Sequence, residues 1–348
     1  MAGRIHCCRC KLRPLGDNGD LCRYMKPSFH HRLVNAPHED PCLYVRIVRE
    51  KRSFLFDAGQ LDRLGSADLM KISDVFVTHT HIDHFIGFDT LLRALLRRDT
   101  PLRVYGPENI IECVAGKLRG YTWNLIEEYP IEIDVFSFTE KEIRHSSFSA
   151  ATRFKRIDRS IRPFDTIVLK EPPFTIKAIN LSHGTPCLGF SLEEDFHINI
   201  DKAALNRMGL PVGPWLGDLK RMIRGTAAPD TPLTIDGRIF KFSDLVAIAK
   251  TTDGQKVSYI TDISPEEENI VKVTDFVNGS DTLYCEAYFL NEDIERALER
   301  HHLTAKIAGG IARKANVKNL VVMHFSPKYR SFPGVIEKEA MEKFKQDL

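Results

Sequence analysis

Residues 77–84 read V-T-H-T-H-I-D-H and place three histidines and one aspartate within six positions. The apolar run Val75–Val77 predicts a short strand, so these side chains lie on a strand-to-helix turn. Imidazole and carboxylate groups bind borderline divalent metals such as zinc, and such a turn can supply two adjacent metal positions. Chance clustering is the alternative, since the chain has 13 histidines, but the spacing favours a two-metal site. The predicted ligands are His79, His81, Asp83 and His84.

The composition indicates a globular protein with nearly balanced charge. A hydrophobic content of 43% in 348 residues can bury a large core, in one big domain or two small ones. The net charge of +2 provides no global field for a nucleic acid, so an RNA-binding surface has to be local. The chain has no apolar stretch of signal-peptide length at its start and no apolar run of 18 residues. We therefore expect a soluble, cytoplasmic protein with no membrane partner.

The cysteines gather near the N-terminus, where five of the eight fall within the first 42 residues. This pattern is not a secreted disulfide framework for such a length, so we expect reduced thiols. Cys7 and Cys10 form a C-x-x-C, and Cys22 with His30 or His31 could complete a small structural zinc site. The alternative is a disordered N-terminal extension, because charged and small polar residues follow the motif.

Short stretches rich in β-branched and aromatic residues recur along the chain and predict strands. Helical patterns are interspersed between runs of strands and do not alternate strictly with them. This order favours an α/β protein with stacked sheets flanked by helices over a doubly wound parallel sheet. The predicted strands are 43–48, 53–56, 75–77, 102–104, 131–138, 166–169, 175–180, 256–260, 282–285 and 320–323, and the predicted helices are 88–97, 109–118, 291–300 and 304–315.

Three more candidate ligands each follow an apolar predicted strand. His183 stands in S-H-G-T-P, Asp262 in Y-I-T-D-I, and His324 in V-V-M-H-F-S-P. A buried carboxylate or imidazole at a strand end needs a partner, and a shared pair of metals supplies one. Taken singly, each is better explained as a hydrogen-bonded core or turn residue. Together with the first motif, they predict a binuclear site.

These motifs resemble those of the metallo-β-lactamase superfamily, and within it the ribonuclease Z group that processes tRNA 3′ ends. S-H-G-T-P-C-L-G-F at 182–190 and C-E-A-Y-F at 285–289 are similar to the group's H-G-x-x-x-x-G-Y/F and H-E-A-T-F. H-H-L-T-A at 301–305 and the H-F-S-P-K-Y that begins at His324 are similar to its H-S-T-A and H-F-S-x-R-Y. The resemblance covers about residues 43–329 and implies an αββα sandwich with a protruding flexible arm.

The resemblance also assigns the metal ligands, by matched position. It implies two divalent metal ions, for which the many histidines favour Zn²⁺, with Mn²⁺ or Fe²⁺ left open. A metal-bridging hydroxide would then attack a phosphodiester, and Asp83 could in addition accept a proton from the attacking water. Asp57, in F-L-F-D-A-G, would brace the metal loop through hydrogen bonds. The implied sets are His79, His81 and His183 for one metal, Asp83, His84 and His324 for the other, and Asp262 between them.

Two further residues match catalytic positions of the group. His302 corresponds to the histidine that protonates the leaving oxygen, and Glu286 to the carboxylate that orients it. The alternative is structural, because His301 and His302 end a predicted helix, where histidine is favourable. Leu303 stands where the group has serine, which removes a hydroxyl near the presumed acid.

The domain division combines the residue composition along the chain with this resemblance. We expect an N-terminal extension over residues 1–28 and a metallo-β-lactamase-fold hydrolase domain over 29–348, with an arm inserted at 193–240. Residues 193–240 hold several Pro and Gly, and a segment of this length without regular periodicity inside a compact domain usually has its own function or is disordered. Its apolar residues argue against plain disorder. The matched Gly-Pro element and the basic residues after it predict RNA contacts at Gly213, Pro214, Lys220, Arg221 and Arg224.

The predicted RNA contacts in the arm have an alternative explanation, and a second part of the chain could also bind RNA. On charge alone the basic run is equally explained as a solvated helix face. A second basic stretch, 141–162, could line a cleft for an RNA backbone. The segment 32–41, R-L-V-N-A-P-H-E-D-P, departs from the R-N-x-S-S of the group and alters the expected phosphate-binding loop.

Three functions therefore compete. The first is a tRNA 3′ processing endoribonuclease that acts on precursor tRNA, removes the 3′ trailer and leaves a 3′ hydroxyl. The second is another hydrolase of this fold, acting on a cyclic nucleotide, a small phosphodiester or a thioester. The third is a non-catalytic RNA- or metal-binding protein, which the full ligand set disfavours. A homodimer is expected by resemblance only.

Overall fold

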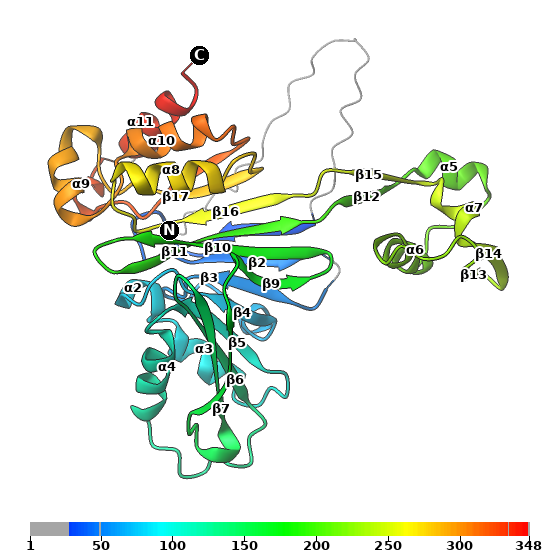
Figure 1. The fold of residues 1–348 in the computed structure, drawn as a ribbon, viewed down its shortest axis with the longest axis horizontal. Helices are drawn as coiled ribbons and strands as arrows, with labels where there is room; N and C mark the ends of the chain where they lie inside the picture. Colours follow the sequence, from blue (N-terminus) through cyan, green and yellow to red (C-terminus); the bar gives the residue numbers. More distant parts are fainter. Residues whose placement is uncertain (1–27, 49, 333, 347–348) are drawn as a thin grey trace, which may run out of the picture.

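The computed structural model describes residues 28–332 except residue 49, together with residues 334–346. Two β-sheets face each other, helices cover the outer face of each sheet, and an arm projects from one end (Figure 1). This four-layer arrangement agrees with the predicted αββα sandwich. In the described part of the chain, no helix has the length and apolar content needed to cross a membrane.

The first sheet has eight strands in the order β1 to β8. Its central pairs, β3–β4, β4–β5 and β5–β6, are parallel, and the flanking pairs are antiparallel. All side chains of β3 are buried because core lies on both faces of the sheet. The strands are β1 Phe29–Leu33, β2 Leu43–Ile47, β3 Ser53–Phe56, β4 Ile72–Phe76, β5 Leu102–Pro107, β6 Glu132–Phe138, β7 Glu142–Ser149 and β8 Ile157–Pro163.

The second sheet has six strands in the order β18-β17-β16-β11-β10-β9. The pairs β16–β17 and β17–β18 are parallel, so the carboxyl ends of these strands meet at one edge. The strands are β9 Ile167–Glu171, β10 Phe174–Ser182, β11 Pro186–Glu194, β16 Lys256–Ile260, β17 Thr282–Glu286 and β18 Leu320–Met323.

An aromatic core joins the two sheets. Phe56 of the first sheet stacks on Phe76 with ring centroids 5.2 Å apart, and lies 5.8 Å from Phe190 and 5.9 Å from Tyr259 of the second sheet. Each of these rings is almost fully buried. Such pairs contribute about 0.5–1.5 kcal/mol each beyond the area they bury. The strand ends that follow Phe56, Phe76 and Tyr259 are therefore held firmly in place.

The helices form the two outer layers. Helix α3 buries Phe88, Leu91, Leu92 and Leu95, the stripe expected of a helix packed on a sheet. Thr304 caps the N-terminus of helix α10, because its hydroxyl accepts a hydrogen bond from the Ile307 N–H. On the first sheet lie α1 Ser66–Leu69, α2 Ile82–Phe85, α3 Phe88–Leu95 and α4 Ile110–Arg119, and on the second α8 Glu267–Phe276, α9 Ile294–Arg300, α10 Ala305–Lys314 and α11 Val335–Phe344.

The arm leaves the sandwich at His197 and returns at Thr252. Two paired strands form its stalk, and Figure 1 shows that this narrow stalk carries a small head of helices and a hairpin. The range differs from the expected 193–240, because Glu193 still pairs with Lys256 in the second sheet and β15 continues the stalk beyond residue 240. The head has its own apolar core, which includes Trp215, Leu219 and Leu245. The arm consists of β12 His197–Ile200, α5 Lys202–Arg207, α6 Trp215–Arg224, β13 Pro232–Ile235, β14 Arg238–Lys241, α7 Phe242–Val246 and β15 Ala249–Thr252.

The predicted cysteine site falls outside the described residues, as does the predicted extension up to residue 27. Of the two histidines proposed to complete that site, His31 lies in β1 with its Nδ1 2.8 Å from the Tyr284 hydroxyl. The other, His30, is exposed on the same strand.

Candidate metal centre

Polar side chains converge where strands of both sheets end. His79 follows β4, His183 lies in the turn between β10 and β11, Asp262 follows β16, and His324 follows β18. The short helix α2 supplies two more. Because the carboxyl ends of neighbouring parallel strands meet at one edge, these distant segments come together there. The ligand atoms form four overlapping groups, each within 4.8 Å: His79, His81 and His183; Asp83, His84 and His324; His79, His84 and Asp262; and Asp262, Glu286, His302 and His324.

Three residues that directly or closely follow strands adopt the left-handed backbone conformation, among them Asp57, which follows β3. Asp57, Asp262 and His324 have φ values of 56°, 52° and 55°. Such conformations cost non-glycine residues about 1–3 kcal/mol and persist where the surrounding structure fixes them. The rigid aromatic core next to them provides that constraint.

The first group consists of imidazoles with different exposure. His79 and His183 are buried, whereas His81 is exposed. His183 Nδ1–H donates a hydrogen bond of 2.7 Å to the His301 carbonyl, which leaves its Nε2 as a lone pair. Burial, together with neighbouring imidazoles, lowers the pKa of His79 to about 2, so this side chain is neutral at pH 7. Neutral imidazole is the form that binds a metal.

The second group combines a carboxylate with two imidazoles. Asp83 Oδ2 lies 3.3 Å from His324 Nε2 and 3.5 Å from His84 Nε2. Asp262 lies between the two groups: its Oδ2 is 2.6 Å from His84 Nε2 and 4.0 Å from His79 Nε2. Its Oδ1 is 3.3 Å from His324 Nδ1 and 3.9 Å from His183 Nε2. One carboxylate thus contacts both groups.

The donor atoms of this centre fit divalent cations. The buried His79 Nε2, His84 Nε2 and His324 Nδ1 have no hydrogen-bond partner among the described residues. His84 Nε2 is close to Asp262 Oδ2 but without hydrogen-bond geometry. Burial opposes a charge on His84, yet Asp262 and Asp57 outweigh it and raise its pKa well above the usual value. The carboxylates of Asp262 and Asp57 therefore favour a positive charge at this position, which either a proton or a metal ion can provide.

Asp57 is fully buried and supports the centre through hydrogen bonds. It accepts hydrogen bonds from the Thr78 N–H at 2.7 Å, the Tyr259 hydroxyl at 3.0 Å and His84 Nδ1–H at 2.8 Å. The last of these bonds fixes the tautomer of His84, so that its Nε2 faces the centre. Asp57 thus has the bracing contacts that the sequence predicted.

Asp57→Asn is expected to lower metal affinity about 10- to 100-fold, because an amide cannot accept all of these hydrogen bonds. Competition with a chelating dye at fixed pH measures this change. The control is Asp74→Asn, a buried carboxylate of β4 that pairs with Arg52 and Arg103. Equal loss of affinity in both variants would mean that general destabilisation, and not the orientation of His84, explains the effect.

Glu286 and His302 form a pair at the rim of the centre. The fully buried Glu286 accepts the Ile263 N–H at 2.7 Å with one oxygen and His302 Nδ1–H at 2.9 Å with the other. Burial lowers the pKa of His302, but Glu286 and Asp262 outweigh this effect and raise it to about 10. His302 is therefore a proton donor at neutral pH. It follows His301, the left-handed residue that ends α9.

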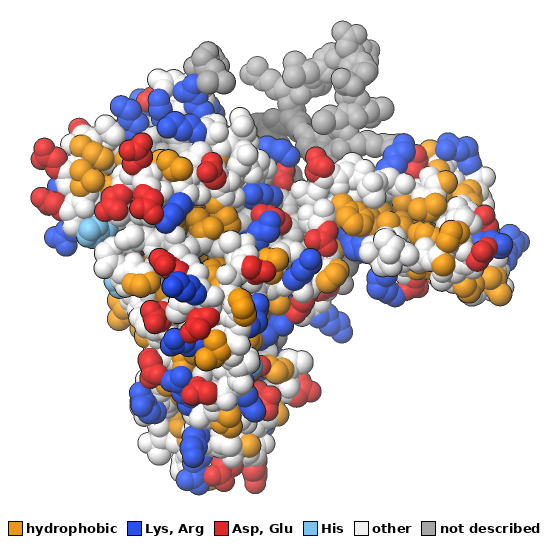
Figure 2. Space-filling model, viewed as in Figure 1, with side chains coloured by type: hydrophobic (Ala, Val, Ile, Leu, Met, Phe, Trp, Pro, Cys, Tyr) orange, Lys and Arg blue, Asp and Glu red, His pale blue; other side chains and the backbone are white. Residues whose placement is uncertain are grey.

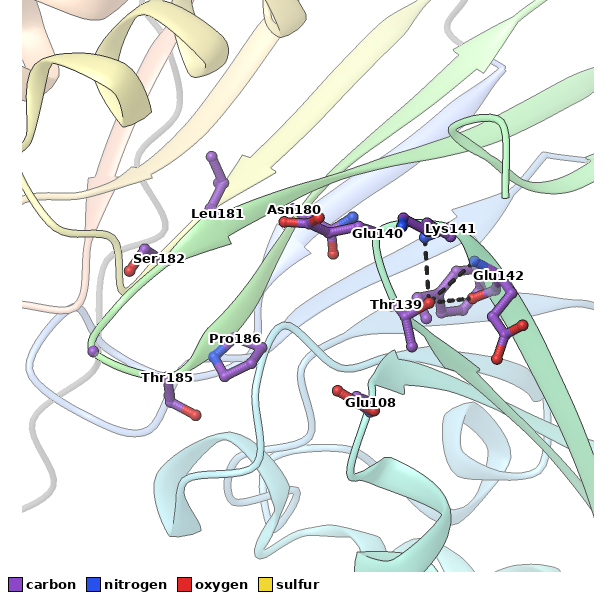
Figure 3. Close-up of a pocket in the computed structure, with 12 residues that line it drawn as sticks. Glu108, Thr139, Glu140, Lys141, Glu142, Asn180, Leu181, Ser182, Thr185 and Pro186 are labelled. Carbon is purple, nitrogen blue, oxygen red and sulfur yellow. Dashed lines mark hydrogen bonds between the residues drawn. The ribbon is translucent and has the colours of Figure 1, made fainter. Parts of the chain in front are cut away.

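A cleft of about 690 Å³ adjoins the first group of ligands, next to the turn that carries His183. Figure 3 shows Asn180 and Glu140 on one side of this cleft and Glu108 on the other. The volume suits a small organic group. The sequence did not predict this cleft, because its lining combines three separate parts of the chain: Glu108, residues 138–142 at the start of the basic stretch, and the turn that carries the His183 motif.

The predicted RNA-contacting residues lie in the arm and not at the metal centre. Gly213 and Pro214 precede α6, whose last turns carry Lys220, Arg221 and Arg224. Arg221 pairs with Asp218, but its side chain is still 76% exposed.

Arg224 has a different place from the one the sequence suggested. Its guanidinium lies 3.4 Å from the buried Glu194 carboxylate and 5.9 Å from the centre of the Phe196 ring. Its side chain is 21% exposed. Arg224 therefore joins the arm to the end of β11, and the RNA contacts proposed below do not include it.

The second basic stretch is partly neutralised. It forms the β7–β8 hairpin, where Arg156 pairs with Glu112 and Asp158, and Arg144 pairs with Glu142. These contacts reduce the positive charge that a phosphate backbone would meet.

No family model matches the sequence. Among curated proteins, the chain is 27% identical to the ribonuclease Z of Deinococcus radiodurans over 309 residues, which cover 86% of this chain and 90% of that protein. It is 29% identical to the ribonuclease Z of Pyrococcus abyssi over 293 residues, which cover 82% of this chain and 80% of that protein. The similarity thus spans most of both chains.

Solved structures have the same fold. The metallo-beta-lactamase fold protein YhfI from Bacillus subtilis superposes with a TM-score of 0.54 at 16% identity, and the match covers 91% of this chain and 93% of that one. A long form RNase Z from yeast gives a TM-score of 0.51 at 15% identity, over 88% of this chain and 39% of that one.

Proposed function

We infer that this chain, which has the metallo-β-lactamase fold and is similar in sequence to ribonuclease Z, is a metal-dependent tRNA 3′ processing endoribonuclease. The observation that carries the proposal is the hydrogen-bonded Glu286–His302 pair beside two ligand groups that Asp262 contacts. A metal-binding module without catalysis has no need of a charged histidine at the rim of its centre.

The proposed ligands follow the geometry of the centre. His79, His81 and His183 would hold one divalent cation, Asp83, His84 and His324 the other, and Asp262 would contact both. A pair of cations supplies a site that orients a phosphodiester, activates water and neutralises developing charge. Zinc is the proposed metal, because imidazole nitrogens are abundant among the donors.

The remaining steps belong to the protein's own side chains. When water adds to phosphorus and the bond to the 3′ oxygen breaks, His302 Nε2–H would give its proton to that oxygen, since Glu286 holds Nδ1. Asp83, a half-buried carboxylate, would accept the proton that the water loses. The products are a tRNA with a 3′ hydroxyl and a trailer with a 5′ phosphate.

The arm is the proposed tRNA-binding element. Figure 2 shows hydrophobic side chains gathered on the face of the arm, with Lys and Arg side chains around its margin. Val212, next to the Gly213-Pro214 element, is 73% exposed. Basic residues there would contact phosphates at a distance from the centre, and the adjoining cleft leaves space for a nucleotide next to the scissile bond.

Replacing Lys220 and Arg221 together with alanine is expected to weaken precursor tRNA binding roughly tenfold and to reduce the slope of log K against log salt by about 1 per residue. Turnover of bis(p-nitrophenyl) phosphate should not change, because this small ester does not reach the arm. Binding is measured over a series of salt concentrations. The control replaces Lys272 of α8 and Lys338 of α11, which lie on the helices of the second sheet and not in the arm. Unchanged RNA affinity at moderate salt would refute the arm assignment.

Cleavage of a 3′-extended precursor tRNA by zinc-loaded protein, beside bis(p-nitrophenyl) phosphate, tests the proposed function. A single cut at the 3′ end of the tRNA body is expected. Turnover of the small ester alone would indicate instead a hydrolase of cyclic nucleotides or other small phosphodiesters. Homodimerisation stays a prediction, which sedimentation equilibrium would test.

A further inference from the structure

The ring of Tyr288 lies next to both His302, the proposed proton donor, and His324, a proposed metal ligand. This ring stacks on the imidazole of His302, with centroids 4.0 Å apart and an interplanar angle of 8°. The same ring lies 5.2 Å from His324, at an angle of 54°. The side chain is half-buried and packs against the core beneath α8 to α11.

The backbone of Tyr288 joins the same two segments. Its N–H donates a hydrogen bond of 3.1 Å to the carbonyl of Leu303, and its carbonyl accepts one of 3.0 Å from the N–H of Ser326. Leu303 directly follows His302, and Ser326 lies two residues after His324. The position of the ring is therefore fixed by the segments that carry both imidazoles.

The hydrogen bonds of His302 do not by themselves fix the direction in which its Nε2 points. Its Nδ1 lies 2.9 Å from Glu286 and 3.2 Å from Asp262. Contacts at one nitrogen leave the ring able to tilt about that point, whereas a parallel aromatic ring fixes its plane. Over the described part of the chain, the hydrogen bonds of the His302 ring involve Nδ1 alone, so that Nε2 is available to substrate.

We propose that Tyr288 is a positioning residue that holds the His302 imidazole in the plane from which Nε2 protonates the leaving oxygen. The inference rests on the proposed function. The H-E-A-T-F motif that C-E-A-Y-F resembles has threonine at this position, which cannot stack on an imidazole. An aromatic support for the acid is thus a feature of this chain's own sequence.

The test compares Tyr288→Phe, which keeps a stacking ring, with Tyr288→Leu, which keeps apolar bulk without one. Two substrates separate positioning from general damage. The ribose 3′ oxygen of precursor tRNA needs a proton to leave, whereas the p-nitrophenolate of bis(p-nitrophenyl) phosphate does not. Metal content is measured for each variant, and Tyr121→Leu, at an exposed aromatic outside the centre, is the matched control.

Tyr288→Leu is expected to lower kcat on precursor tRNA about 10- to 100-fold at unchanged KM and full metal content, since small misplacement of a catalytic group costs up to about 100-fold. Turnover of the ester should stay close to that of the unaltered protein, and Tyr288→Phe should restore RNA cleavage. Equal losses on both substrates, full activity of Tyr288→Leu on RNA, or failure of Tyr288→Phe to restore it would each overturn the proposal.

A separate measurement keeps this proposal apart from the proposed function. The ring current of Tyr288 should shift the His302 Hε1 resonance upfield in the unaltered protein and in Tyr288→Phe, and the shift should be lost in Tyr288→Leu. Absence of that shift refutes the stacking. An unaltered protein that shows the shift but cuts no precursor tRNA refutes the nuclease function, and with it the role of the stack in catalysis.

Discussion

Asp262→Ala is expected to abolish hydrolysis of both precursor tRNA and bis(p-nitrophenyl) phosphate. The variant removes the carboxylate that contacts both ligand groups, at 2.6 Å from His84 Nε2 in one group and 3.9 Å from His183 Nε2 in the other. Loss of a metal pair forfeits several kcal/mol of transition-state stabilisation, which corresponds to at least about 1,000-fold in rate. Metal analysis after dialysis should show that the variant retains less metal than the unaltered protein.

Two further variants separate this expectation from misfolding. Asp262→Asn keeps the shape of the side chain and suits the left-handed backbone of this position, where φ is 52°. It should fold normally and still bind metal poorly, because the negative charge is lost. Asp275→Ala, at an exposed aspartate of α8, should leave metal content and both activities unchanged. Full metal occupancy in Asp262→Ala would show that this carboxylate does not hold the metals.

The prediction of the fold succeeded because its decisive signals are local. Each predicted strand overlaps an observed one, and the metallo-β-lactamase αββα sandwich is confirmed. Four strands of the two large sheets were not predicted, namely β1, β7, β8 and β11. In β7 and β8, the basic and serine-rich residues of this exposed edge hide the alternation that marks a strand. Helix α9 begins later than predicted, because Asn291–Asp293 forms a 3₁₀ turn first.

The ligand positions could be found in the sequence because each is adjacent to a strand. His183, Asp262 and His324 follow apolar runs, and parallel strands bring such ends together without any further information. Their assignment as ligands stays a prediction. The left-handed backbone at Asp262 and His324 could not be foreseen, since neither residue is glycine and the tertiary contacts around them fix the conformation.

Side-chain contacts between distant segments could not be predicted from the sequence. Arg224 was predicted to contact RNA because it is a basic residue that follows the matched Gly-Pro element, but in the folded chain it lies beside the buried Glu194. Tyr288 stands in a motif as a simple replacement of threonine, and only the folded chain sets its ring on His302. In both cases the contacts come from segments that are distant in the sequence, so the sequence alone does not identify them.

His302→Ala is expected to lower cleavage of precursor tRNA about 100- to 10,000-fold, the range typical of losing a general acid. Both metals should stay bound, because His302 lies at the rim and is not among the proposed ligands. Turnover of bis(p-nitrophenyl) phosphate should fall little, since p-nitrophenolate leaves without a proton. The comparison of the two substrates in one preparation, with metal content measured alongside, is the decisive measurement.

The matched control for this variant is His301→Ala. His301 is the neighbouring histidine, and its carbonyl, which accepts from His183 Nδ1–H, is retained on substitution. Since its backbone is left-handed, with φ at 57°, alanine there should cost some stability but leave the acid in place. Equal loss of RNA cleavage in both variants would remove the reason to assign the proton to His302. Loss of metal from His302→Ala would mean that this imidazole helps to hold the metals, since it lies 3.2 Å from the carboxylate they are proposed to share.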